Sequence, residues 1–186
     1  MSKYVTSMST ITLVVIKHLR KEANHSQEWV ADKLVRSKSD WTKIENLQSA
    51  LTLDVMFKLC EAFKVYPSDL MKVVDDYIDY LVENGWDVTT GMIDPKDDSL
   101  LLASKDFYTS ESYTQKGSTL KRRCERFSIM ETEITRRHKG KIFPLLEYAA
   151  SEDYKNKVLN NPSYFSLDGI NDMIDEIHKT FSCPKN

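Results

Sequence analysis

Five amphipathic segments joined by short connections occupy the first 85 residues of this chain. In each segment, apolar residues recur at spacings of three and four, which is the pattern of a helix with one buried face. The expected N-caps are Thr10, Ser26, Ser37 and Thr52, Pro67 suits the first turn of the fifth helix, and Asn84-Gly85 ends it. The sequence therefore predicts a compact five-helix domain over residues 1–85, with helices at 10–23, 27–34, 38–46, 53–63 and 67–81.

The pattern changes after Gly85. Two short stretches rich in β-formers, 86–93 and 99–104, are separated by the turn cluster Asp-Pro-Lys-Asp-Asp, which predicts a β-hairpin. A polar loop is expected at 109–117, and helices are expected at 118–139, 143–150, 153–159 and 166–181. The predicted fold class is mainly α, with a five-helix N-terminal domain followed by an α+β domain over 86–186 for dimerisation or regulation.

Charge and composition exclude several classes of protein. The net charge is −2, which argues against indiscriminate coating of nucleic acid. The signs are segregated, because residues 71–110 hold three basic and nine acidic side chains, whereas 111–141 hold nine basic and four acidic. No apolar run approaches the roughly 20 residues of a membrane-spanning helix, and no secretory cleavage site is apparent. The three cysteines are far apart and are expected to be reduced thiols of a cytoplasmic protein.

Residues 26–46, Ser-Gln-Glu-Trp-Val-Ala-Asp-Lys-Leu-Val-Arg-Ser-Lys-Ser-Asp-Trp-Thr-Lys-Ile-Glu-Asn, carry the most functional information. Two helices that cross closely need a small residue at their contact, and Ala31 supplies one. Trp41 and Ile44 are expected to insert the second helix into the core. Its polar and basic side chains would then face outward. This arrangement is typical of a helix-turn-helix.

The same stretch resembles the helix-turn-helix of the Cro and lambda-repressor (Xre) family, and the resemblance extends without gaps over about residues 10–71. The residues that carry it are Ser26, Gln27, Glu28, Ala31, Ile44, Glu45 and Asn46. The chain departs from the family pattern at Val35 and Leu47, where the family commonly has glycine, and at Leu51, where it commonly has proline. A β-branched residue at Val35 is costly if the turn requires a positive φ.

The resemblance implies that the second helix of the pair enters the major groove of double-stranded DNA. Lys38 and Lys43 are candidates for contacts with guanine O6 and N7, and Ser39 for contacts with either kind of base. Asp40 could accept a hydrogen bond from cytosine N4 or orient Lys43. Gln27 matches the family's phosphate-contacting glutamine, and Ser37 and Thr42 complete the predicted surface. The alternative interpretation of this polar face is an ordinary solvated helix.

Other candidate sites give weaker signals. The basic segment 121–141 is either a second nucleic-acid surface or a solvated helix whose cations pair with the acidic block. Asp94, Asp97 and Asp98 lack the spacing of a calcium loop and are better explained by a turn. The four histidines form no catalytic pattern with nucleophiles or carboxylates. No enzyme activity, metal or cofactor is therefore predicted.

The function predicted from the sequence is a dimeric, sequence-specific transcription regulator, a repressor of prokaryotic or phage origin. The apolar faces of the helices at 118–139 and 166–181 are candidate dimer surfaces, with core packing as the alternative. The rival hypothesis is an antitoxin-like protein that autoregulates its operon and binds a partner protein, an antirepressor or a toxin, through residues 86–186. In a third hypothesis the second domain senses a small ligand.

Overall fold

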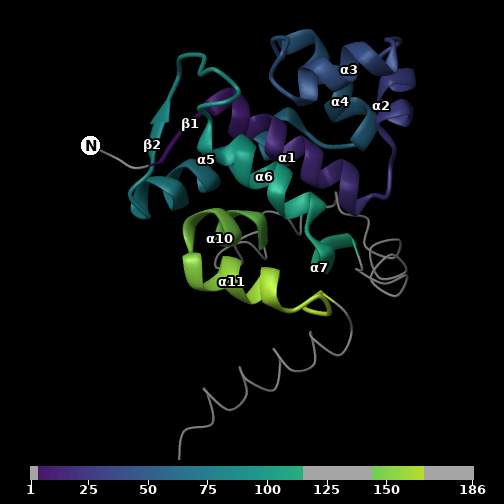
Figure 1. Ribbon diagram of the computed structural model, residues 1–186. Coiled ribbons are helices and arrows are strands. Elements are labelled where there is room, and N and C mark those ends of the chain that lie inside the picture. Colours follow the sequence, from purple (N-terminus) through teal and green to yellow (C-terminus); the bar gives the residue numbers. More distant parts are fainter. Residues whose placement is uncertain (1–3, 115–143, 166–186) are drawn as a thin grey trace, which may run out of the picture.

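The computed structural model describes residues 4–114 and 144–165. Within these ranges the chain is mainly helical and contains a small two-stranded parallel sheet (Figure 1). The elements are β1 (Val5–Ser7), α1 (Met8–Glu22), α2 (Gln27–Lys33), α3 (Lys38–Glu45), α4 (Leu53–Phe63), α5 (Pro67–Glu83), β2 (Asp87–Thr89), α6 (Ser99–Thr109), α7 (Glu111–Thr114), α10 (Pro144–Ala150) and α11 (Glu152–Asn160).

The five helices expected in the first 85 residues are present. Ser26, Ser37 and Thr52 cap α2, α3 and α4, because each side chain accepts a hydrogen bond from a backbone N–H in the first turn. The expected cap of the first helix was wrong. α1 begins at Met8, two residues before Thr10, and its N-cap is Ser7. Apolar periodicity does not locate this start, because the cap Ser7 and the first-turn residue Thr10 are polar side chains that are nevertheless buried.

All five helices end in the same way. Just after each helix one residue adopts a left-handed conformation, and the N–H of the residue that follows it bonds to the carbonyl five positions back in the chain. The left-handed residues are Asn24, Val35, Leu47, Lys64 and Gly85, with φ values of 56°, 53°, 59°, 55° and 80°. Backbone hydrogen bonds therefore set the sharp turns between these helices, even where the residue is not glycine.

The predicted hairpin at 86–104 was wrong. β2 pairs with the N-terminal strand β1 in parallel, with Val5 opposite Asp87 and Ser7 opposite Thr89. The stretch 99–104 instead begins α6, whose N-cap is Asp98. The stretch 99–104 has four apolar residues between two serines. Such a short apolar run fits a buried strand and a buried helix equally well, and only the surroundings distinguish them. Part of the expected loop at 109–117 is also helical, because α7 begins immediately after Ser110.

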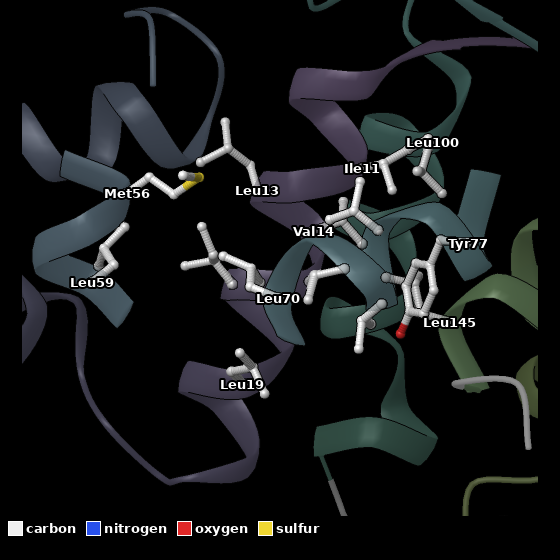
Figure 2. Packing of buried hydrophobic residues seen from close by; sticks show 14 of the residues in the cluster. Ile11, Leu13, Val14, Leu19, Met56, Leu59, Leu70, Tyr77, Leu100 and Leu145 are labelled. Atoms are coloured by element: carbon white, nitrogen blue, oxygen red, sulfur yellow. The ribbon is translucent and has the colours of Figure 1, made fainter. Parts of the chain in front are cut away.

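Helix α1 lies at the centre of the buried cluster. It packs on α5 and on α6, and its side chains share one buried cluster with those of α4 (Figure 2). Five aliphatic residues of α1 are at most 2% exposed: Ile11, Leu13, Val14, Val15 and Ile16. α10 packs on α5 and α6, so the cluster extends as far as Val158 and crosses the expected boundary at residues 85 and 86.

The second half of the chain contains two of the expected helices, α10 and α11, close to their predicted bounds. The helices predicted at 118–139 and 166–181 lie outside the described residues, as does the basic segment 121–141. Across the described ranges, no helix combines the length and the apolar character needed to cross a membrane.

Candidate nucleic-acid interface

The pair α2 and α3 lies at one side of α1, away from α10 and α11 (Figure 1). The two helices pack against each other, and Ala31, the small residue of α2, is 1% exposed. Trp41 is completely buried and Ile44 is 4% exposed. These two side chains anchor the inner face of α3 and so orient its other face toward solvent.

A buried polar contact holds α3 to the helices before it. Arg20 of α1 donates to Glu45 Oε1 from Nε at 3.0 Å and from Nη2 at 2.7 Å, and it donates to the His25 carbonyl from Nη1 at 3.0 Å. Gln27, the first residue of α2, donates from its side-chain amide to the other oxygen of Glu45. Arg20 and Glu45 are 5% and 2% exposed. The last residue of α3 is thereby held by both α1 and α2 with its charge paired.

The outer face of α3 has three side chains with no hydrogen-bond or ion-pair partner among the described residues. They are Lys38, Ser39 and Lys43, and all three are exposed. Lys38 and Ser39 lie in the first turn of α3, and Lys43 lies in its last turn. Their donor atoms are available to a ligand, because no internal contact has to be broken first.

Four other predicted site residues already have partners. Ser37 Oγ accepts from the Asp40 N–H at 3.0 Å and donates to Asp40 Oδ2 at 2.8 Å, so the two residues form the helix cap. The Asp40 side chain therefore bonds to the cap residue Ser37 and does not orient Lys43. Thr42 is half-buried and donates to the Lys38 carbonyl at 2.8 Å. The side-chain amide of Gln27 already donates one of its two N–H groups to Glu45.

The turn between α2 and α3 adds residues that the sequence analysis did not select. An open hollow of about 790 Å³ adjoins it, lined by Asp32, Leu34, Val35, Arg36, Ser37, Asp40 and Lys58. Arg36 and Lys58 bring two cations to the edge of the outer face of α3. Arg36 was detectable, because it immediately precedes the cap of α3. Lys58 comes from α4, and only the packing of the helices brings it here.

Val35 is the strained residue of this turn. It has φ 53° and its side chain is 93% exposed. Its own N–H bonds to the Asp32 carbonyl at 3.1 Å, and the following Arg36 N–H bonds to the Ala31 carbonyl at 2.9 Å. These bonds offset the cost of the left-handed backbone, so the turn forms with valine where glycine would be unstrained.

Metal binding and similarity to known proteins give no further assignment. Among the described residues, no group of three or more His, Cys, Asp or Glu side chains is arranged to hold a metal ion. Comparisons of the chain with family models, with curated proteins and with solved structures found no match.

Proposed function

We propose that this protein is a sequence-specific DNA-binding transcription regulator, acting in the cytoplasm as a homodimeric repressor. The observation that carries the proposal is the two-sided character of α3. One face is locked into the core, and the other presents Lys38, Ser39 and Lys43 without internal partners. A rigid helix with short polar and basic side chains on its outer face suits the major groove of double-stranded DNA. In this proposal residues 1–85 act as a lambda-repressor-like domain.

In the proposed complex, the outer face of α3 contacts base edges. Lys38 and Lys43 donate to guanine O6 and N7, and Ser39 bonds to either kind of base. Ser37 and Asp40 keep the first turn of α3 rigid, so less conformational entropy is lost when the helix enters the groove. The cap contact between these two residues supports this division of roles.

The turn before α3 supplies contacts to the DNA backbone in this proposal. Arg36 and Lys58 border the hollow beside α3, where they would pair with phosphates and set the register of the helix on the duplex, with Lys58 giving up its exposed ion pair with Asp54. Such contacts carry no sequence information of their own, and they make the affinity depend on salt.

Two copies of the chain would act together. One recognition helix contacts only a few base pairs, so useful specificity requires two half-sites about 34–36 Å apart, one turn of DNA. The expected operator is therefore a palindrome. The dimer surfaces expected at 118–139 and 166–181 belong to the same proposal.

Selection of bound fragments from a random DNA pool tests the proposal. The wild type, the Lys38→Ala/Lys43→Ala variant and a Lys72→Ala control are compared, because Lys72 is an exposed lysine of α5 outside this surface. The expected result is a palindromic site enriched by the wild type and the control but not by the double variant. Circular dichroism checks that each variant is folded.

Two outcomes would contradict the proposal. One is that the wild type enriches no site, and the other is that the double variant enriches the same site equally well. In either case the antitoxin-like alternative would be preferred, and a protein partner would be sought by co-purification.

A further inference from the structure

Three lysines from two helices gather where α6 packs on α1. Lys17 Nζ lies 5.0 Å from the centroid of the Tyr108 ring, and Lys21 Nζ lies 5.6 Å from the same centroid. Lys17 also donates to Ser104 Oγ at 3.3 Å. Lys105, the neighbour of Ser104 on α6, is close enough to act electrostatically on Lys17. These residues form a cationic cluster: Lys17, Lys21 and Lys105 around Ser104 and Tyr108.

The cluster has no anion of its own in the part of the chain that the structure describes. The ion pairs found there join Arg20 to Glu45, Lys58 to Asp54, and Lys96 to Asp94. Glu45 is the only carboxylate that acts on Lys17, and it is already bound by Arg20. Lys17 and Lys21 are also four residues apart on one helix, a spacing at which like charges repel.

The electrostatic consequence appears at Lys17. The pKa of its ammonium group is lowered from 10.5 to about 8; burial is the largest cause, Glu45 opposes it, and Lys21, Arg20 and Lys105 contribute to the lowering. Burial likewise lowers the pKa of Lys21, and Arg20 adds to that effect. An anion placed among these groups would relieve the repulsion and favour the charged form of Lys17.

We propose that the cationic cluster at the α1–α6 contact is a binding site for a phosphate group. The Lys17 and Lys21 ammonium groups both lie over the Tyr108 ring, and Lys105 of α6 adds a third positive charge close enough to act on Lys17. A dianion gains most from such an arrangement, because each lysine contributes a charge-assisted hydrogen bond. The proposal is independent of DNA binding, since none of these residues lies on the outer face of α3.

The surroundings of the cluster determine how the site should respond to pH. The charged and titratable groups around Lys17 and Tyr108 are Lys21, Arg20 and His18 on α1, Glu45 on α3, Tyr77 on α5, and Lys105 on α6. Lys17 is the group among them whose pKa is lowered to about 8. Phosphate binding should raise that pKa, so the complex takes up a proton near this pH.

Isothermal titration of the full chain with inorganic phosphate tests the proposal, with sodium chloride at matched ionic strength as the blank. We expect saturable binding that weakens as the pH rises from about 7 to about 9.5. At pH about 8 the measured heat should vary with the ionisation enthalpy of the buffer, because a proton is taken up. A parallel titration with glycerol phosphate distinguishes a phosphorylated small molecule, which should bind more tightly, from the free ion.

Variants decide whether these residues form the site. Lys17→Gln and Lys105→Gln should each weaken phosphate binding by about tenfold. Lys17→Gln should also abolish proton uptake. Lys105 is exposed, so its variant does not disturb the core, and Lys72→Gln should bind like the wild type. Absence of saturable heat, or unchanged affinity in both cluster variants, would overturn the proposal.

Discussion

Arg20 and Glu45 form a buried ion pair that joins the last turn of α1 to the last residue of α3, with Arg20 Nη2 2.7 Å from Glu45 Oε1. The pair fixes the position of α3 on the core from the end opposite its exposed cap. Because both side chains are almost inaccessible, removing one of them leaves a buried charge without a partner.

Glu45→Ala should therefore lower the free energy of unfolding by about 3–5 kcal/mol, measured by urea denaturation. Asp54→Ala is the matched control, because it breaks the exposed pair with Lys58 and should cost at most about 1 kcal/mol. Similar losses in the two variants would contradict the structural role of the Arg20–Glu45 pair.

Val35→Gly should stabilise the protein by about 1 kcal/mol, because glycine adopts the left-handed backbone without strain. The Val35 side chain is 93% exposed, so little packing is lost. Gly85→Ala is the converse change. It introduces a Cβ at φ 80°, where nothing lies within 4 Å of it, and should destabilise by about 1 kcal/mol from backbone strain alone. Thermal unfolding measures both. Destabilisation by Val35→Gly would show that the turn is not strained.

Asp98→Ala should destabilise the fold by about 3 kcal/mol. The Asp98 carboxylate is fully buried and accepts hydrogen bonds from the Thr6 and Thr10 hydroxyls and from the Leu101 N–H. It therefore caps α6 and ties α6 to the N-terminal segment. Asp97→Ala alters the exposed neighbour and should have little effect. Guanidinium unfolding compares the two variants, and equal stabilities would refute the proposed role of Asp98.

Lys17 should make stability depend on pH. Its folded-state pKa is about 8, against an ordinary value of 10.5, so between these values the unfolded chain binds more protons and stability rises with pH. Lys17→Met removes a buried charge and should stabilise the protein by about 1–3 kcal/mol at neutral pH, with the gain shrinking to nothing above about pH 10.5. Denaturation at a series of pH values measures it, and a gain that is independent of pH would contradict the lowered pKa.

If the protein binds DNA through α3, Arg36 and Lys38 should have different effects. Arg36→Ala should weaken binding to all sequences alike and reduce the slope of affinity against salt by about one. Lys38→Ala should cost about 1–3 kcal/mol on the selected site and relax the preference at one position. Fluorescence anisotropy at several salt concentrations separates these effects. Interchanged behaviour of the two variants would assign base contact to Arg36 instead.

Local sequence signals were sufficient to predict most of the helices in the first 85 residues. Helix periodicity and the caps Ser26, Ser37 and Thr52 predicted α2, α3 and α4 closely, because each signal depends on neighbours within one or two turns. The burial of Trp41 and Ile44, and hence the outward direction of the opposite face of α3, followed from the same periodicity.

The hairpin prediction failed because the contacts that decide the structure of residues 86–104 are with residues far away in the chain. Residues 99–104 are apolar enough for either a strand or a helix. Asp98 is typical of a turn in the sequence, and its role as a helix cap becomes evident only from its hydrogen bonds with Thr6 and Thr10. β2 likewise pairs with a strand more than 80 positions earlier in the chain, and no turn residues in the sequence indicate such a pairing.

The sequence by itself determined which segments of the first 85 residues are helical and which face of α3 is polar, since both depend on periodicity along one helix. Tertiary structure alone decided which of those polar side chains keep free donors. Gln27 turns inward to Glu45, and Lys58 reaches the edge of this surface from α4. The physical reason is that hydrogen bonding and burial depend on groups distant in the chain, whose positions are set only when the helices pack.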